Sequence, residues 1–206
     1  RPLGKLGVAT VARKGNEAGE SPLGNLIADA IVAATRDQGV QIGFMNTGGI
    51  RKDLDTGEGM VATFGHAQAV LPFGNTLVVM DLTGAQLRRL LEQQWDRPAA
   101  SGSTILQISQ GLSYQWDEKR PVGSRLVPGS LKFNGVPVDD GKTYRVVANN
   151  FLAEGGDNLP EFAKGTNRVD TQLVDLDALS DFIAKHPGAG APQAGMVSST
   201  RIEKVR

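Results

Sequence analysis

The sequence contains no cysteine, and this absence excludes disulfide frameworks, thiol catalysis and cysteine-ligated zinc sites. It fits a bacterial envelope protein and a cytosolic protein equally well. No apolar run approaches the roughly 20 residues that are needed to cross a bilayer. The first residues, RPLGKLGVATVARKG, lack the apolar core of a signal peptide. Because the chain begins at Arg1 without a methionine, we expect a mature form or an excised piece of a longer protein.

An excess of one charge is missing as well. Lys and Arg together number 22, and Asp and Glu together also number 22. A surface that binds a nucleic-acid polymer needs a basic excess to displace counterions from phosphates, so the balance argues against such a partner. One small anion held by a single arginine remains compatible with this charge.

The apolar residues, 40% of the 206, are enough to fill the core of one domain. A helix is predicted after Ser21, a good N-cap, with Pro22 at its first position and Gly39 as its stop. A second helix is predicted from Thr83, with a capping-box glutamine three residues later, to residues 97–98. A third is predicted to be capped by Asp175 and to stop before residues 187–188.

Strands are predicted where short apolar or alternating runs end at Gly, Pro or Asp turns. They cover residues 7–11, 40–45, 76–82, several segments between 105 and 147, and 200–206. This order predicts an α+β fold with mixed α/β layers, in a single domain over residues 1–206. Residues 187–199 have the composition of a flexible linker.

Metal-binding and catalytic motifs are scarce. His66 and His186 have no potential ligand at a useful spacing, so structural roles are favoured, with His186 bonding the last carbonyls of a helix. The stretch DLDTGEG, residues 53–59, has a weak likeness to a calcium loop but lacks its third acidic position and its terminal glutamate. A G-x-x-x-x-G-K-[ST] loop and a G-x-S-x-G elbow are both missing. We therefore expect no metal site and no catalytic residue in this chain.

Three glycine-rich loops are the better candidates for a binding site. NTGGIR, residues 46–51, follows an apolar strand, and α/β proteins often bind ligands at the carboxyl ends of strands. Its glycines allow close backbone approach, and Arg51 supplies a fork suited to phosphate or carboxylate. PFGNT and EGGDN each lie near a phenylalanine, Phe73 and Phe151. Taken alone, the first two loops are better interpreted as simple turns, one a tight turn with a surface arginine and one with Phe73 in the core. The alternative for the third loop is a hairpin turn.

The two phenylalanines give the loops a common purpose. The chain has only seven phenylalanines, yet two of them lie against such loops. Two rings that face each other across a cleft can clamp a flat base, and each stack contributes about 1–3 kcal/mol. A carboxylate or amide beside the rings would supply the hydrogen bonds that select one base.

The stretches SPLGNLIADA, NTGGIR, LPFGNTLVVMDLTGAQL and YRVVANNFLAEGGDNLPEF, in this order, resemble the C-terminal domain of the 5'-nucleotidase family. That family includes UDP-sugar hydrolases and 2',3'-cyclic-nucleotide 2'-phosphodiesterases. The resemblance covers about residues 7–162. It implies the fold of that domain, a nucleoside or nucleotide substrate, and a periplasmic or secreted location.

The resemblance also implies roles for individual residues. Phe73 and Phe151 correspond to the two rings that sandwich the base, and Asp157 to the acceptor for the ribose hydroxyls. Asn75 would hydrogen-bond the base. Asn46 and Arg51 would lie on the ribose and phosphate side of the ligand. Gly111, in ISQGLSY, would correspond to a glycine whose backbone faces the base.

In this family, hydrolysis depends on an N-terminal metallophosphatase domain with two divalent metals. The motifs D-x-H, GNHE and GHxH do not occur in this sequence. The resemblance therefore implies that this domain is absent from the chain, that it is the chain's natural partner, and that the chain alone is inactive.

Two departures from the family pattern stand out. Family members commonly carry another arginine just before the LGNL helix, where this chain has Gly19 and Glu20, with Arg13 farther upstream. Phosphate binding would then depend on Arg51 alone, or the substrate differs. The family often has GGDG where this chain has GGDN, which leaves Asp157 in place.

Three functions are compatible with these observations. The first is the substrate-recognition domain of a 5'-nucleotidase-type phosphohydrolase. The second is a stand-alone nucleotide-binding module without catalysis, and the third is a structural domain with a dead cleft. The joint presence of the residues named above argues against the third. A metallophosphatase domain upstream of Arg1 would distinguish the first from the second.

Overall fold

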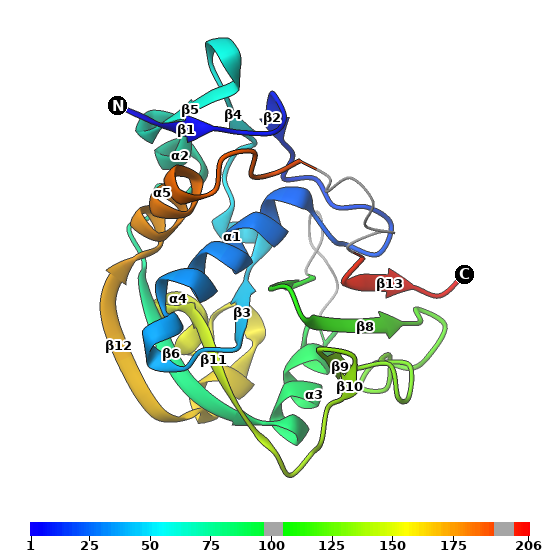
Figure 1. The fold of residues 1–206 in the computed structure, drawn as a ribbon. Coiled ribbons are helices and arrows are strands. Elements are labelled where there is room, and N and C mark those ends of the chain that lie inside the picture. Colours follow the sequence, from blue (N-terminus) through cyan, green and yellow to red (C-terminus); the bar gives the residue numbers. More distant parts are fainter. Residues whose placement is uncertain (97–104, 192–199) are drawn as a thin grey trace.

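A computed structural model describes residues 1–96, 105–191 and 200–206. Its centre is a five-stranded sheet in the order β12-β6-β11-β3-β7 (Figure 1). The neighbours β11 and β3 are parallel, and the other pairs are antiparallel. The strands, in sheet order, are β12 (Thr166–Val174), β6 (Thr76–Thr83), β11 (Thr143–Asn149), β3 (Ile42–Met45) and β7 (Gln107–Ile108).

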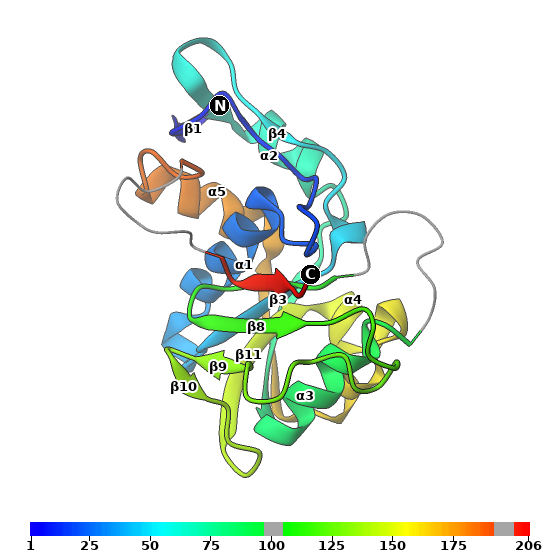
Figure 2. The same cartoon turned by 90° about the vertical axis from the view of Figure 1, so that its right-hand side faces the viewer.

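Helices and a smaller sheet cover the two faces of this central sheet. The first face carries α1 (Pro22–Ala34), α2 (Phe64–Val70) and α5 (Asp175–Lys185). The second face carries α3 (Gly84–Gln93) and a four-stranded sheet in the order β10-β9-β8-β13 (Figure 2). The smaller sheet consists of β8 (Leu112–Trp116), β9 (Lys132–Phe133), β10 (Val136–Pro137) and β13 (Ile202–Lys204).

Alternation along β6 explains the two cores. Leu77 and Val79 belong to the cluster beneath α1 and α5, whereas Val78 and Met80 belong to the cluster beneath α3. Successive side chains of a strand point to opposite faces, so one buried strand contributes to both cores. The mixed α/β layers expected from the sequence are thereby confirmed.

The remaining elements are short. β1 (Pro2–Lys5) pairs with β5 (Val61–Thr63), and β2 (Thr10–Val11) pairs with β4 (Leu54–Asp55). A short helix, α4 (Asn150–Ala153), follows β11. The 3-10 turns are Arg36–Gln38, Thr47–Gly49, Glu58–Met60, Gly156–Asn158 and Pro160–Lys164.

The predicted helix starts are confirmed at two positions. The Ser21 hydroxyl accepts a hydrogen bond from Gly24 N at 2.8 Å, and Pro22 is the first helical residue. Thr83 and Gln86 form the reciprocal capping box, at 2.9 and 3.1 Å. These bonds satisfy amides at the helix start that have no partner within the helix.

Three other predictions about helix ends differ from the structure. α1 ends at Ala34, and the expected stop Gly39 ends the following 3-10 turn instead, with φ of 76°. Asp175 is not the cap of α5 but its first residue, after the N-cap Val174, and its carboxylate accepts from Leu176 N at 2.7 Å. α3 ends at Gln93, and the expected stop at residues 97–98 lies outside the described residues.

The predicted strand at residues 7–11 is wrong in its first part. Only Thr10–Val11 is a strand, because the Gly7 amide donates to Ala189 O at 3.0 Å instead of to a neighbouring strand. Gly188 N also donates to Lys5 O at 2.9 Å, so residues 188–189 pack against the start of the chain. The other part of the linker-like segment, residues 192–199, lies outside the described residues.

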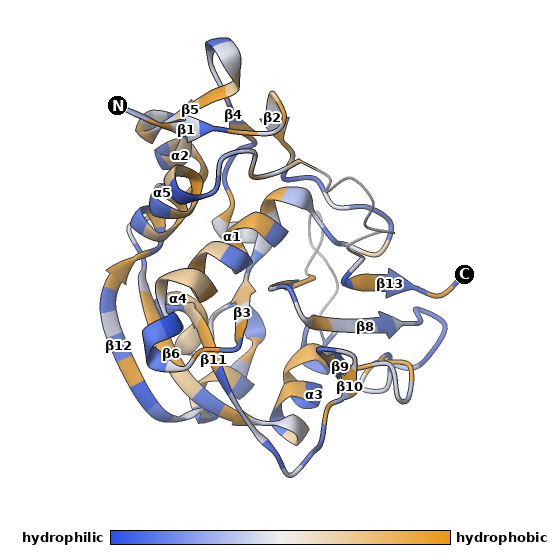
Figure 3. Ribbon diagram, viewed as in Figure 1, coloured by the Kyte–Doolittle hydropathy of each residue, from blue (hydrophilic) through white to orange (hydrophobic). Residues whose placement is uncertain are grey.

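The sequence analysis did not identify the edge strand β12. Most of its residues are exposed, and polar and apolar residues interleave along it (Figure 3). Asn167 and Gln172 have positive φ, and the register with β6 shifts beside each of them. Such bulges interrupt the period of two that identifies a strand, and they also protect an edge from further pairing.

Candidate functional site

Strand pairing brings the three glycine-rich loops to one end of the central sheet. Asn149, the last residue of β11, lies opposite Leu77 of β6, and Val147 lies beside Gly43 of β3. The chain therefore leaves β3 and β11, and enters β6, at the same end of the sheet. This placement gathers the loop at residues 46–51, the loop at residues 71–75 and the segment from α4 onward.

Two buried asparagines join the first and third of these segments. Asn149 Nδ2 donates to Asn46 Oδ1 at 2.9 Å. The Asn149 side-chain oxygen accepts from Leu152 N at 2.8 Å and so caps α4. Asn46 is itself buried, so this bond fixes its side chain at the end of β3.

Arg51 joins the first loop to the second. Its guanidinium carbon lies 5.8 Å from the centroid of the Phe73 ring, within the range of a cation–π contact. Its Nη1 donates to Gly48 O at 3.2 Å, and its backbone N donates to Val70 O at 2.9 Å. The Phe73 ring is 59% exposed and is not part of the core.

The Phe151 ring rests on Gly156, the residue directly before Asp157. A β-carbon at position 156 would lie 2.7 Å from two atoms of the Phe151 ring, so only glycine lets the ring rest there. Phe151 is 45% exposed. Asp157 follows directly, with φ of 57°. The segment is a helical turn, so the hairpin alternative for EGGDN is wrong.

The second loop is tied to the start of α5. Asp175 N donates to Asn75 O at 2.9 Å, and the Asn75 side chain is half-buried. Burial raises the pKa of the Asp175 carboxyl to about 6, and nearby Asp177 adds to this effect, while the hydrogen bond from Leu176 N opposes it. The carboxylate is therefore destabilised by its surroundings at neutral pH.

Gly111 is not brought to the other candidates. β7 runs antiparallel to β3, with Met45 opposite Gln107 and Phe44 opposite Ile108. Gly111 therefore lies towards the start of β3, whereas Asn46 follows its end. There it has φ of 102° and its carbonyl accepts from Asn134 N at 2.9 Å.

The structure gives a physical reason for the missing upstream arginine. Gly19 has φ of 93°, and an ideal β-carbon there would lie 2.5 Å from the Ile105 side chain. A longer side chain would be strained at this position. Glu20 is buried and accepts hydrogen bonds from Arg201 N and Ile202 N at 2.6 and 2.7 Å, so it holds β13 in place.

The histidines have structural contacts, as expected. His66 Nδ1 accepts from Thr63 N at 2.9 Å and completes the capping box of α2. His186 Nδ1 lies 2.9 Å from Phe182 O, and its ring stacks on the Phe182 ring. Within residues 1–96, 105–191 and 200–206, no group of three or more His, Asp or Glu residues could hold a metal ion.

The acidic stretch at residues 53–59 holds a strand pair together. Asp53 accepts from Arg13 N at 2.8 Å, and Asp55 accepts from the Thr10 hydroxyl at 3.2 Å. Both carboxylates therefore bond the β2 side of the β2–β4 pair.

In the part of the chain that the structure describes, no helix is long and apolar enough to span a membrane.

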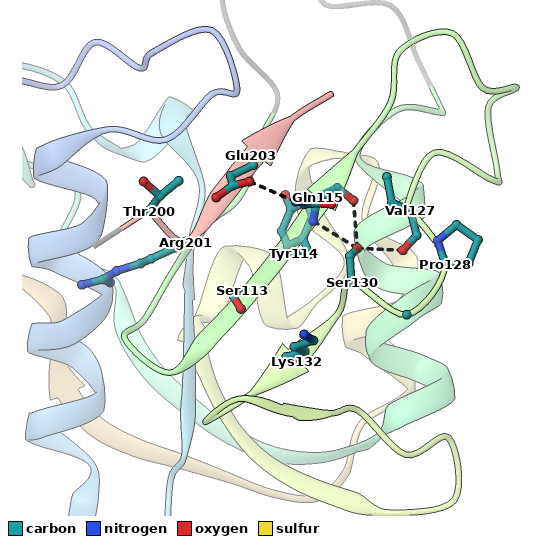
Figure 4. A pocket seen from close by; sticks show the side chains of 11 residues that line it. Ser113, Tyr114, Gln115, Val127, Pro128, Ser130, Lys132, Thr200, Arg201 and Glu203 are labelled. Carbon is teal, nitrogen blue, oxygen red and sulfur yellow. Dashed lines mark hydrogen bonds between the residues drawn. The ribbon is translucent and has the colours of Figure 1, made fainter. Parts of the chain in front are cut away.

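A separate polar pocket of about 330 Å³ lies on the smaller sheet (Figure 4). Its walls come from β8, β13 and the turn at residues 127–130. Gln115 bonds both Glu203 and Ser130 there. None of the sequence-predicted site residues lines it; the lining residues are Ser113, Tyr114, Gln115, Val127, Pro128, Gly129, Ser130, Lys132, Thr200, Arg201 and Glu203.

These features define a layered α/β domain in which two exposed rings, an arginine and an aspartate gather at one end of the central sheet. A family model described as "5'-nucleotidase, C-terminal domain" matches residues 2–164. The chain belongs to this family. The matched range includes all three loops of the candidate site.

Three relatives illustrate the similarity. The trifunctional nucleotide phosphoesterase protein YfkN of Bacillus subtilis is 34% identical over 88% of this chain and 13% of that protein. The cell wall protein Lmo0130 of Listeria monocytogenes is 36% identical over 83% of this chain and 22% of that protein. A 5'-nucleotidase precursor from Thermus thermophilus has a solved structure with a TM-score of 0.78 and 37% identity, over 100% of this chain and 39% of that one. This chain therefore spans well under half of each relative.

Two residues beside the site were missed by the sequence analysis. Asn149 has a recognisable signal, since asparagine is a favoured N-cap and a short apolar run follows it. Arg168 has none, because its hydrogen bonds go to backbone carbonyls of Ala153 and Phe162, at positions that no local pattern marks.

Proposed function

We propose that this chain recognises the nucleoside part of a nucleotide substrate, with Phe73 and Phe151 stacking on the two faces of the base. The observation that carries the proposal is the exposure of both rings, which lie on loops that strand pairing brings to one end of the central sheet. Large aromatic rings usually lie in the core, so two exposed rings beside polar groups favour a binding site.

Polar groups around the rings match the rest of a nucleotide. Asp157 would accept hydrogen bonds from ribose hydroxyls, and Asn75 would bond the base edge. Arg51 would bind the phosphate through its planar fork, with the Asn46 Nδ2 group on the ribose side. Gly111 is left out of the proposed site, because the β3–β7 register puts it towards the other end of β3.

We further propose that the chain acts within a longer phosphohydrolase that works outside the cytoplasm. Supporting this, the relatives are much longer than the chain, and their names include a nucleotide phosphoesterase, a 5'-nucleotidase and a cell wall protein. Bond cleavage would then occur in a separate domain with two divalent metals. The chain by itself would bind substrate without hydrolysing it.

Titration of the chain with adenosine, followed by amide NMR signals, tests the binding proposal. The expected shifts cluster at residues 46–51, 73–76 and 150–158. Shifts confined to the pocket of Figure 4, or no shifts at all, would contradict it. A parallel assay with AMP should release no phosphate, with or without added Mg²⁺ or Mn²⁺.

A further inference from the structure

The segment that carries Phe151 and Asp157 is fastened from a neighbouring strand. Arg168 lies on the edge strand β12. Its Nη2 donates to Ala153 O at 2.6 Å, and its Nη1 donates to Phe162 O at 2.8 Å. One guanidinium therefore bridges the last residue of α4 and a carbonyl of the 3-10 turn Pro160–Lys164.

Ala153 O lies at a helix end, where the helix cannot satisfy it, whereas Phe162 O also accepts from Gly165 N at 3.1 Å. The last carbonyls of a helix have no amide partner within it, and α4 spans only Asn150–Ala153. A guanidinium is a rigid planar fork, so two simultaneous bonds fix the spacing of the two acceptors. Residues 153 and 162 flank Asp157, and fixing their spacing closes the turn that presents this carboxylate.

The closed turn has an unfavourable backbone. Asp157 and Asn158 both have positive φ, 57° and 59°, in a region that residues with a β-carbon adopt uncommonly. Such a conformation persists only where surrounding contacts determine it. Leu152, Leu159 and Phe162 anchor the segment in the core, but Asn158 itself is exposed.

Within the part of the chain that the structure describes, Arg168 forms no ion pair. Among the described residues no carboxylate lies within 4.0 Å of its guanidinium nitrogens, whereas Arg145 on the adjacent part of the sheet pairs with Asp81. Its two short hydrogen bonds are to the segment, and Met80 Sδ is 3.5 Å from its Nη1. The side chain is therefore placed to hold backbone rather than to neutralise an acid.

We propose that Arg168 is a positioning residue that sets the shape of the Phe151–Asp157 segment before any ligand binds. It acts from the C-terminal side of the segment, while Asn149 acts from the N-terminal side. Removing it opens the turn, and Phe151 and Asp157 then lose their common orientation. The consequence for ligand affinity rests on the function proposed above.

The test compares Arg168→Gln, Arg168→Lys and a matched control, Arg88→Gln. The Arg88 guanidinium also donates to a backbone carbonyl, Val138 O, and its other bond goes to Asp140, so both bonds lie outside the segment. Hydrogen exchange of the amides at residues 154–159 is measured without ligand, and adenosine affinity is measured by calorimetry.

We expect Arg168→Gln to speed exchange at residues 154–159 roughly tenfold, with the α1 amides unchanged. Adenosine affinity should fall about fivefold or more. Lysine can donate to one carbonyl and should restore part of both effects, which a general loss of stability would not allow. Arg88→Gln should leave both quantities at the wild-type value.

Unchanged exchange at residues 154–159 in Arg168→Gln overturns the proposal. So does wild-type adenosine affinity in that variant, provided that the wild-type chain binds adenosine. If the wild-type chain does not bind it, the proposed function fails, and the exchange measurement still decides whether Arg168 shapes the segment. If Arg168→Gln does not fold, the same comparison is made with Arg168→Lys, in which a wild-type exchange rate contradicts the proposal.

Discussion

Asn149 Nδ2 donates to Asn46 Oδ1 at 2.9 Å and to Met45 Sδ at 3.8 Å, and these hydrogen bonds join the ends of β11 and β3 beneath the candidate site. Both residues are buried. The same Asn149 side chain caps α4 through Leu152 N. One amide therefore fixes the loop that carries Arg51 relative to the helix that carries Phe151.

Replacing Asn149 separates these two contributions. Asn149→Ala removes the cap and leaves the buried Asn46 oxygen without this donor, so the free energy of unfolding should fall by about 2–4 kcal/mol. Asn149→Ser keeps a capping oxygen, and its loss should be smaller by about 1 kcal/mol. Urea unfolding of the three proteins measures both. Equal losses for alanine and serine would show that the cap contributes nothing.

The raised pKa of Asp175 leads us to expect a specific pH dependence of the free energy of unfolding. Its folded pKa of about 6 lies above the ordinary value of 3.8, so between these values the folded state binds more protons than the unfolded state. The contribution of this residue to stability therefore falls as pH rises from about 4 to 6, and reaches a constant penalty above that.

Asp175→Asn removes the penalty and keeps the side-chain oxygen that accepts from Leu176 N. At pH 7 the variant should be more stable than the wild type by up to about 3 kcal/mol, and the difference should shrink towards pH 5. Asp181→Asn, at an exposed position of the same helix, is the control and should change stability by less than about 0.5 kcal/mol. A difference that stays constant from pH 5 to pH 7 would contradict the role of burial at Asp175.

Glu20 should control the attachment of β13. Its Oε1 accepts from Arg201 N and Ile202 N, and charge-assisted bonds of this kind contribute about 1.5–3 kcal/mol each. Glu20→Ala should speed amide exchange at Ile202–Lys204 and lower stability by about 2–3 kcal/mol. Glu20→Gln keeps an acceptor oxygen and should lose less. If exchange at β13 is the same in Glu20→Ala and in the wild type, another contact holds that strand.

Much of the fold was predictable from local patterns. Ser21-Pro22 and the Thr83 capping box mark helix starts by their own chemistry, and buried strands such as β3 and β6 are marked by apolar runs bounded by turns. β12 was not predictable in this way. Its bulges at Asn167 and Gln172 break the alternation, and its partner β6 lies far away in the sequence.

The candidate site was predictable only as separate loops. Their gathering depends on the register between β11, β6 and β3, which no single motif states. Gly111 is an example. Its motif places it next to a strand but does not indicate at which end of the sheet it lies, and the register puts it away from the three loops. The roles of Arg168 and Glu20 depend on carbonyls and amides of distant segments, and backbone groups leave no mark in a sequence.

The most direct test of the account is the adenosine affinity of the wild-type chain and of Phe151→Ala and Phe182→Ala, measured by calorimetry. Phe182 stacks on His186 in α5, and its replacement controls for the loss of an aromatic ring elsewhere. We expect Phe151→Ala to weaken binding by about 1–3 kcal/mol and Phe182→Ala to leave it unchanged. Equal affinity of the wild type and Phe151→Ala, or no binding by the wild type, would contradict the account.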